Sequence, residues 1–216
     1  MDLKNKRVVF LGDSITQGVG ASCDANAYVN VFKRKSGAEV FNFGISGTRI
    51  AEQSKPSPEP SFDETFERRA KKMPKEADVV VVFGGTNDFG HGDAAFGCFE
   101  DRSLYTFFGA LHSLCRMLIE KYPSSHIVFM TPLHRLSENA TVNEYGIACK
   151  ALRSYVEAIR EVCEYYSVPV LDLYATSGMQ PSVPIIREMY MPDGLHPSDA
   201  GAEKIADMLV AYLSKV

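Results

Sequence analysis

Apolar residues occur along this chain in two alternating patterns. Short, unbroken runs of Val, Ile and Phe alternate with longer segments whose apolar residues recur every three or four positions. Unbroken runs are typical of strands buried on both faces of a parallel sheet, whereas the longer spacing is typical of amphipathic helices. The pattern predicts five strands, at Arg7–Leu11, Glu39–Phe43, Asp78–Phe83, His126–Thr131 and Pro169–Asp172.

The segments between these strands predict helices. The clearest apolar stripes lie at Leu104–Glu120, Glu144–Tyr166 and Pro197–Leu213, and weaker ones lie at Tyr28–Lys35 and Phe62–Met73. Ser103 is the expected N-cap of the helix that begins at Leu104, because its hydroxyl can accept a bond from a free backbone N–H. Pro197 suits the first position of the last helix, where a missing N–H costs nothing.

Alternating strands and helices predict an α/β fold. We expect a three-layer α/β/α sandwich around a central five-stranded parallel sheet, formed by residues 1–216 as a single domain. In open sheets of this kind the ligand site lies beyond the carboxyl ends of the strands. The segments at those ends are "GDSIT", "GISGT", "GGTND", "PLHR" and "LYATSG", with "MPDGLHPSDAG" before the last helix. Residues with a chemical function are therefore expected there.

Composition narrows the class of protein. The net charge is −4, which argues against a nucleic-acid partner, because such a partner favours a basic face. No segment approaches the ~20 apolar residues that span a bilayer or resembles the apolar core of a secretory signal. The five cysteines are odd in number and contain no C-x-x-C pair, which favours a reducing compartment. We expect a cytoplasmic protein without a membrane span, and the oligomeric state stays open.

The glycine-rich corners do not match known phosphate or metal motifs. "GDSITQG" lacks the lysine of a P-loop, and "GVGASC" has Cys23 where a dinucleotide-binding motif has its third glycine. The G-x-S-x-G motif of α/β-hydrolases is also absent. His91, Asp93 and His134 follow predicted strands, which leaves a loose metal site as an open alternative to a role in a pocket or in solvent. We expect neither a metal nor a cofactor.

Serine catalysis fits the strand ends best. It needs a nucleophile, a base, a group that orients the base, and donors for the developing oxyanion. Ser14 at the first corner is the candidate nucleophile, and Asp193 and His196, three residues apart, are the candidate orienting acid and base. Gly47 and Asn87 are candidate donors, through a backbone N–H and a side-chain amide. Each residue also has a structural interpretation: Ser14 as a helix cap, the Asp–His pair as a turn and cap, and Gly47 and Asn87 as turn residues.

The same residues give the chain a strong resemblance to a known family. "GDS" around Ser14, "NFGISGT" with Gly47, "GGTND" with Asn87 and "DGLHPS" with Asp193 and His196 occur in the order typical of SGNH (GDSL-type) hydrolases. The resemblance implies a flavodoxin-like α/β/α fold and metal-free ester hydrolysis. It also implies that Ser14 is the nucleophile, that Asp193 and His196 complete the triad, and that the oxyanion hole combines the N–H groups of Ser14 and Gly47 with the Asn87 amide.

The loops after the third and fourth strands bear on the substrate. Phe89, Phe96 and Phe99 either wall an acyl pocket or anchor their loop to the core. His91 and His134 make the predicted crevice polar, so we expect Phe89, His91 and His134 among the pocket residues. A short acyl group on a polar alcohol, such as an acetylated carbohydrate, suits such a crevice better than a long-chain lipid.

Other functions stay open at this point. The same catalytic residues suit a lysophospholipase or a thioesterase acting on another small-molecule ester. A catalytically silent binding module on a flavodoxin-like scaffold is an alternative of a different class. Asp13 is expected to be a structural turn acid, because Asp193 already fills the orienting role.

Overall fold

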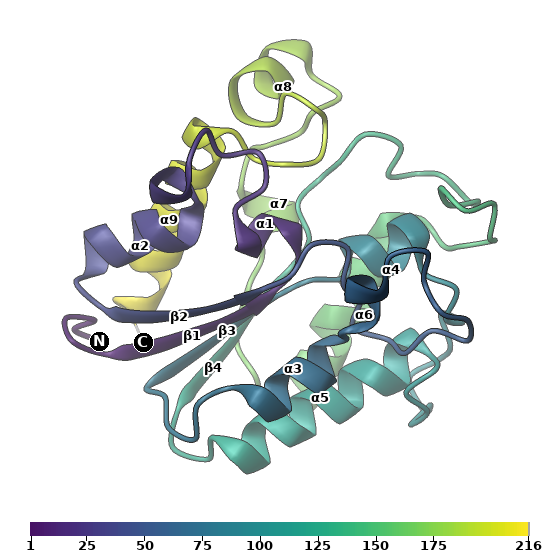
Figure 1. The fold of residues 1–216 in the computed structure, drawn as a ribbon, viewed down its shortest axis with the longest axis horizontal. Coiled ribbons are helices and arrows are strands. Elements are labelled where there is room, and N and C mark those ends of the chain that lie inside the picture. The colour runs from purple at the N-terminus through teal and green to yellow at the C-terminus, as the bar shows by residue number, and fades with distance from the viewer. Residues whose placement is uncertain (216) are drawn as a thin grey trace.

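The five predicted strands form one parallel sheet in the computed structural model, which describes residues 1–215 (Figure 1). They are β1 (Arg7–Gly12), β2 (Glu39–Gly44), β3 (Val79–Phe83), β4 (His126–Met130) and β5 (Val170–Leu171). Their order across the sheet is β2-β1-β3-β4-β5, and every neighbouring pair is parallel. This order is that of flavodoxin-like sheets, so the predicted fold class is confirmed.

Helices fill the connections between the strands. The α-helices are α1 (Ser14–Gln17), α2 (Tyr28–Ser36), α3 (Phe66–Lys72), α4 (Thr86–His91), α5 (Phe107–Lys121), α6 (Leu152–Tyr165), α7 (Leu173–Thr176), α8 (Pro184–Tyr190) and α9 (Asp199–Leu213). Two 3₁₀ turns, η1 (Asp24–Asn26) and η2 (Pro60–Asp63), precede α2 and α3. Figure 1 shows α2 and α9 on one face of the sheet and α3, α5 and α6 on the other.

The core has one half on each face of the sheet, because successive strand residues point to opposite sides. Val9, Leu11, Val80, Val82, Ile127 and Phe129 pack with residues of α3, α5 and α6. Val8, Phe10, Val79, Val81, Val128 and Met130 pack with residues of α2 and α9. Cys115 and Cys163 are fully buried in the first half as free thiols.

Four predicted helix starts were wrong. The helix expected from Phe62 begins at Phe66, because Pro60–Asp63 forms a separate 3₁₀ turn. Thr106 rather than Ser103 caps α5, through a bond from the Gly109 N–H to its hydroxyl. Pro197 precedes α9, whose cap is Ser198. The helix expected from residue 144 begins only at Leu152.

The segment before α6 forms a loop because local bonds satisfy its backbone. The Asn143 side chain accepts hydrogen bonds from the N–H groups of Tyr145 and Ile147, at 3.0 and 3.1 Å. Gly146 between them has φ +74°, a conformation outside the right-handed helix. Asn side chains compete with helix formation in this way. The loop carries Tyr145 to the carboxyl edge of the sheet, where it lines the cavity described below.

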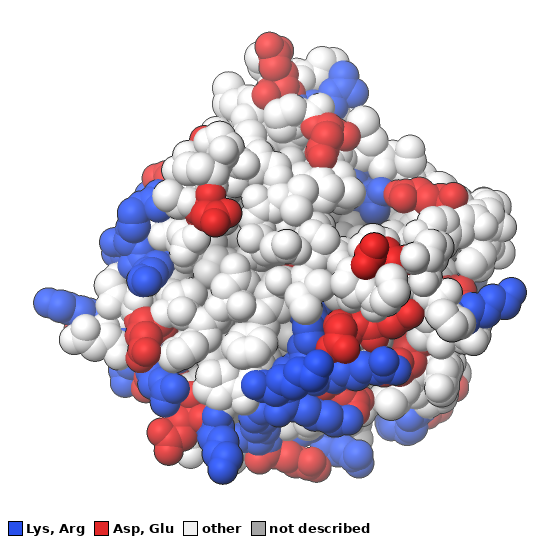
Figure 2. Space-filling view, in the orientation of Figure 1, with Lys and Arg blue, Asp and Glu red and all other residues white. Residues whose placement is uncertain are grey.

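Basic side chains gather over α3 on the face shown in Figure 2. The ion pairs there join Arg68 to Glu52, Lys71 to Glu67 and Lys72 to Glu64. These basic groups therefore have acidic partners beside them. Within residues 1–215, no helix combines the length and apolar character needed to cross a bilayer.

Candidate active site

Ser14 lies where β1 turns sharply into α1. A Cβ on Gly12 would overlap the Thr16 side chain, and a Cβ on Gly44 would overlap the backbone at Gln17, so both positions require glycine for space. Asp13 caps α1 by accepting a hydrogen bond from the Ile15 N–H at 3.0 Å. Asp13, which was expected to be a structural turn acid, is therefore the N-cap of the helix. Ser14 is not the cap but the first residue of the helix.

A chain of hydrogen bonds joins Ser14 to two residues 179 and 182 positions away (193 − 14 and 196 − 14). His196 Nε2 lies 3.0 Å from Ser14 Oγ, and His196 Nδ1 lies 2.7 Å from Asp193 Oδ2. Since the carboxylate only accepts, Nδ1 carries the proton and Nε2 accepts from the serine hydroxyl. The structure thus brings together the three residues predicted to form a triad.

The Asp193 carboxylate holds the turn as well as the imidazole. Its Oδ1 accepts from the backbone N–H groups of Leu195 and His196, at 2.8 and 2.7 Å. Partial burial acts to raise the pKa of Asp193, but the hydrogen bonds from the His196 side chain and the two backbone groups lower it below its usual range. The carboxylate therefore stays ionised at neutral pH and can hold the His196 ring by accepting from its Nδ1–H group.

The loop after β2 is tied to the start of α4. The Asn87 side-chain amide donates to the Thr48 carbonyl at 3.0 Å. The Asp88 carboxylate accepts from the backbone N–H groups of Ile50 and Ala51, at 3.0 and 2.9 Å. These bonds fix the loop that contains residue 47 relative to the Asn87 amide.

Gly47 completes the arrangement. Its φ is +71°, and a Cβ would overlap the ring of Phe62, so another residue would be strained and crowded there. Within residues 1–215, no hydrogen bond occupies the N–H of Gly47 or of Ser14. One amide hydrogen of Asn87 is likewise unused by the bond to Thr48. Three donors are therefore available beside Ser14.

Buried charges lie beneath this corner. Arg69 of α3 is 2% exposed and donates to the carbonyls of Gly12 and Phe43 and to the Thr48 hydroxyl. It therefore connects the ends of β1 and β2 with the loop after β2. Burial raises the pKa of Asp13 to about 7, although the Ile15 N–H and the positive charge of Arg69 act in the opposite direction.

Replacement of Asp13 by Asn is expected to flatten the dependence of stability on pH. The pKa of Asp13 is raised from 3.8 to about 7 in the folded protein. Between these values the unfolded chain loses a proton that the folded protein keeps, so stability falls as pH rises, by up to roughly 1.4 kcal/mol per pH unit. Urea unfolding of both proteins at pH 4 to 8 measures this slope. Equal slopes would show that Asp13 is ionised in the folded protein.

A cavity of about 350 Å³ opens over Ser14 and His196. Its lining residues are Ser14, Val19, Ser46, Gly47, Phe62, Asn87, His91, Arg135, Glu144, Tyr145, Leu195 and His196. His91 was among the pocket residues expected from the sequence, whereas Phe62, Glu144 and Tyr145 were not. Phe62 lay in a predicted helix and the other two at the start of another, so no periodic signal pointed to them.

Two predicted pocket residues lie elsewhere. Phe89 is 3% exposed and packs against Tyr155 in the core. The His134 ring lies against Tyr174, and its Nδ1 contacts Glu138 at 2.8 Å. Neither lines the cavity, so the expectation for both was wrong. Phe96 and Phe99 also anchor their loop to the core rather than wall an acyl pocket.

The alternative of a metal site has no support in the geometry. Asp93 accepts hydrogen bonds from the Ser54 hydroxyl and from the backbone N–H groups of Ser54 and Lys55. In the part of the chain that the structure describes, His, Cys, Asp and Glu side chains form no group of three or more suited to a metal ion. His91, Asp93 and His134, the residues of that open alternative, are not part of any such group.

Comparisons with known proteins agree with this geometry. A protein-family model described as the GDSL-like Lipase/Acylhydrolase family matches residues 10–204. One solved structure is 36% identical, covers 100% of this chain and 99% of its own, and has a TM-score of 0.84. A protein from Lactobacillus plantarum is 32% identical with a TM-score of 0.82, and 98% of each chain is covered. No curated protein matches the sequence.

More distant solved structures share the fold. An acetyl xylan esterase is 22% identical with a TM-score of 0.66, covering 95% of this chain and 98% of its own. A lipase/acylhydrolase from Enterococcus faecalis is 22% identical with a TM-score of 0.64, covering 97% and 96%. Because the family model spans most of the sequence, the chain belongs to the GDSL-like lipase/acylhydrolase family and is a hydrolase of ester bonds.

Proposed function

We propose that the chain, acting as one domain over residues 1–216, is a serine esterase for short-acyl esters. The observation that carries the proposal is the hydrogen-bonded chain from Ser14 through His196 to Asp193, with Ser14 and His196 lining one cavity. A nucleophile, a base and an orienting acid in this geometry have the roles of a serine hydrolase triad.

The proposed reaction follows from the atoms present. His196 Nε2 takes the Ser14 proton as Oγ attacks the ester carbonyl carbon. The N–H groups of Ser14 and Gly47 and the Asn87 amide stabilise the oxyanion, because donors fixed in advance need no reorganisation. His196 then protonates the leaving alcohol, and water repeats the sequence to release the acid. Asp193 holds the imidazole and stabilises its charged form throughout.

The proposed substrate is a small ester with a short acyl group, such as an acetylated carbohydrate. The cavity of about 350 Å³ lies near the lower end of ligand sites, which supports a small substrate. Arg135 and Glu144 in its wall favour a polar alcohol over a hydrocarbon chain. The distant structural relative that is an acetyl xylan esterase has a substrate of this kind.

A panel of esters tests the substrate class. We expect the highest kcat/KM among p-nitrophenyl esters for acetate and a steady decline as the acyl chain lengthens, because a cavity of about 350 Å³ leaves little room for a long chain beside the alcohol. Acetylated sugars are expected to be hydrolysed, whereas lysophospholipids and acyl-CoA thioesters are poor substrates. A clear preference for long-chain esters, lysophospholipids or thioesters would replace this proposal with the corresponding alternative.

A further inference from the structure

His91 lies one helical turn beyond Asn87 on the same face of α4. Residues four apart are neighbours on a helix surface, and four residues advance the axis by about 6 Å. Both side chains line the cavity over Ser14. His91 therefore faces a part of a bound ester that lies about 6 Å from the carbonyl oxygen, which is the atom that the Asn87 amide faces.

Arg49 determines which nitrogen of His91 carries the proton. The Arg49 side chain is 2% exposed, and its Nη1 lies 3.3 Å from His91 Nδ1 and 3.4 Å from the His91 carbonyl. A guanidinium has only donors, so Nδ1 accepts and the proton of the neutral ring is on Nε2.

The surroundings of His91 also keep the ring neutral. Burial, together with the positive charge of Arg49, lowers the pKa of His91 to about 4. Arg135 acts in the same direction, and Glu144 acts against it. The ring is thus a neutral hydrogen-bond donor throughout the range from pH 5 to 8.

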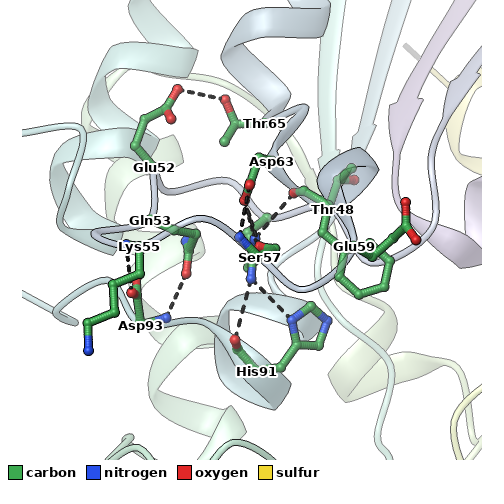
Figure 3. A network of polar contacts seen from close by, with 12 residues as sticks. Thr48, Glu52, Gln53, Lys55, Ser57, Glu59, Asp63, Thr65, His91 and Asp93 are labelled. Carbon is green, nitrogen blue, oxygen red and sulfur yellow. Dashed lines mark hydrogen bonds and ion pairs between the residues drawn. The ribbon is translucent and has the colours of Figure 1, made fainter.

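The donor is held in place but has no partner. The His91 ring packs against the rings of Phe62 and Tyr145, with centroids 5.3 and 5.6 Å away. No hydrogen bond joins His91 Nε2 to any residue from 1 to 215. Nε2 is also not among the fully buried side-chain polar atoms without a partner, which in this part of the chain are Arg49 Nε and Arg135 Nε. Figure 3 shows the second ring nitrogen of His91 pointing away from the contacts at Nδ1. The Nε2–H group is therefore open to a ligand in the cavity.

We propose that His91 is a specificity-determining residue that donates its Nε2–H to an acceptor oxygen in the alcohol part of the ester. The inference rests on the proposed function, since the distance is counted from the proposed oxyanion donor Asn87. An acetyl group ends one C–C bond, about 1.5 Å, from the carbonyl carbon and does not reach His91. In a sugar acetylated on its exocyclic carbon, the ring oxygen lies four bonds from the carbonyl carbon of the acetyl group. This reach matches the separation of about 6 Å between the parts of the ester that face Asn87 and His91.

Two esters that differ in one atom test this contact. Tetrahydropyran-2-ylmethyl acetate has the ring oxygen, and cyclohexylmethyl acetate has a methylene in its place. We expect the wild-type enzyme to favour the first in kcat/KM by roughly 3- to 10-fold, the worth of one neutral hydrogen bond. His91→Phe keeps an aromatic ring in the stack but no donor, so its ratio should fall to about 1. His126→Phe, at an exposed histidine that begins β4, should keep the wild-type ratio.

A second measurement is independent of turnover. The ¹⁵N resonances of His91, assigned by their loss in His91→Phe, are expected to show the neutral Nε2–H form at pH 7. A charged ring or an Nδ1–H form would overturn the proposal, as would an equal ratio for the two esters in wild type or an unchanged ratio in His91→Phe. Failure of the proposed function is distinct, because the wild-type enzyme would then hydrolyse neither acetate, or Ser14→Ala would still hydrolyse both.

Discussion

Ser14→Ala is expected to lower kcat for p-nitrophenyl acetate by roughly 10⁴-fold or more. The variant loses the oxygen that His196 Nε2 contacts at 3.0 Å, so it cannot form the covalent acyl-enzyme intermediate. His196→Ala should cost about as much, and the double variant should be no worse than either single variant, because triad members act as a unit. Steady-state kinetics of the three variants measures these losses.

Covalent labelling separates this prediction from a general loss of structure. A fluorophosphonate probe should label the wild type and leave Ser14→Ala unlabelled. Ser46 offers a matched control, because it lines the same cavity but its hydroxyl donates to Gln17 Oε1 at 2.7 Å and faces no base. Ser46→Ala should still be labelled. Ester hydrolysis near the wild-type rate in Ser14→Ala would exclude Ser14 as the nucleophile.

The strands were predictable because each contains a short apolar run, which is almost wholly buried in β1, β3 and β4. In β3, for example, all five residues from Val79 to Phe83 are buried, so the run of Val and Phe left no competing interpretation. The position of the candidate site followed from the same pattern. The parallel sheet brings the ends of β1 and β3 side by side, and with them Ser14 and Asn87.

The walls of the cavity were not predictable in the same way. Tyr145 reaches the cavity because Asn143 bonds to its backbone and Gly146 departs from helical conformation, whereas spacing alone suggested a helix. Phe89 was expected in the pocket because it follows a strand end by a few residues. In the structure Phe89 lies on the face of α4 that packs against Tyr155 and the core. A helix of six residues is too short for the spacing of apolar residues to show which of its faces is buried.

Asn87→Ala is expected to lower kcat by ~10²–10³-fold with little change in KM. The Asn87 amide donates one hydrogen to the Thr48 carbonyl at 3.0 Å, which orients the second hydrogen toward the cavity. A donor aimed at the oxyanion acts mainly in the transition state, because the ground-state carbonyl oxygen carries less charge. Its loss should therefore appear in kcat rather than in substrate binding.

The distribution of the loss between kcat and KM distinguishes two roles for Asn87. If the amide only binds substrate, KM should rise while kcat stays near the wild-type value. If the Thr48 bond matters only for folding, Asn87→Ala should unfold at a lower temperature and retain its kcat when assayed well below that transition. Thermal unfolding of the variant, followed by circular dichroism, tests whether the bond to Thr48 matters only for folding. A large loss in kcat in a protein that is still folded at the assay temperature is the result that the oxyanion role requires.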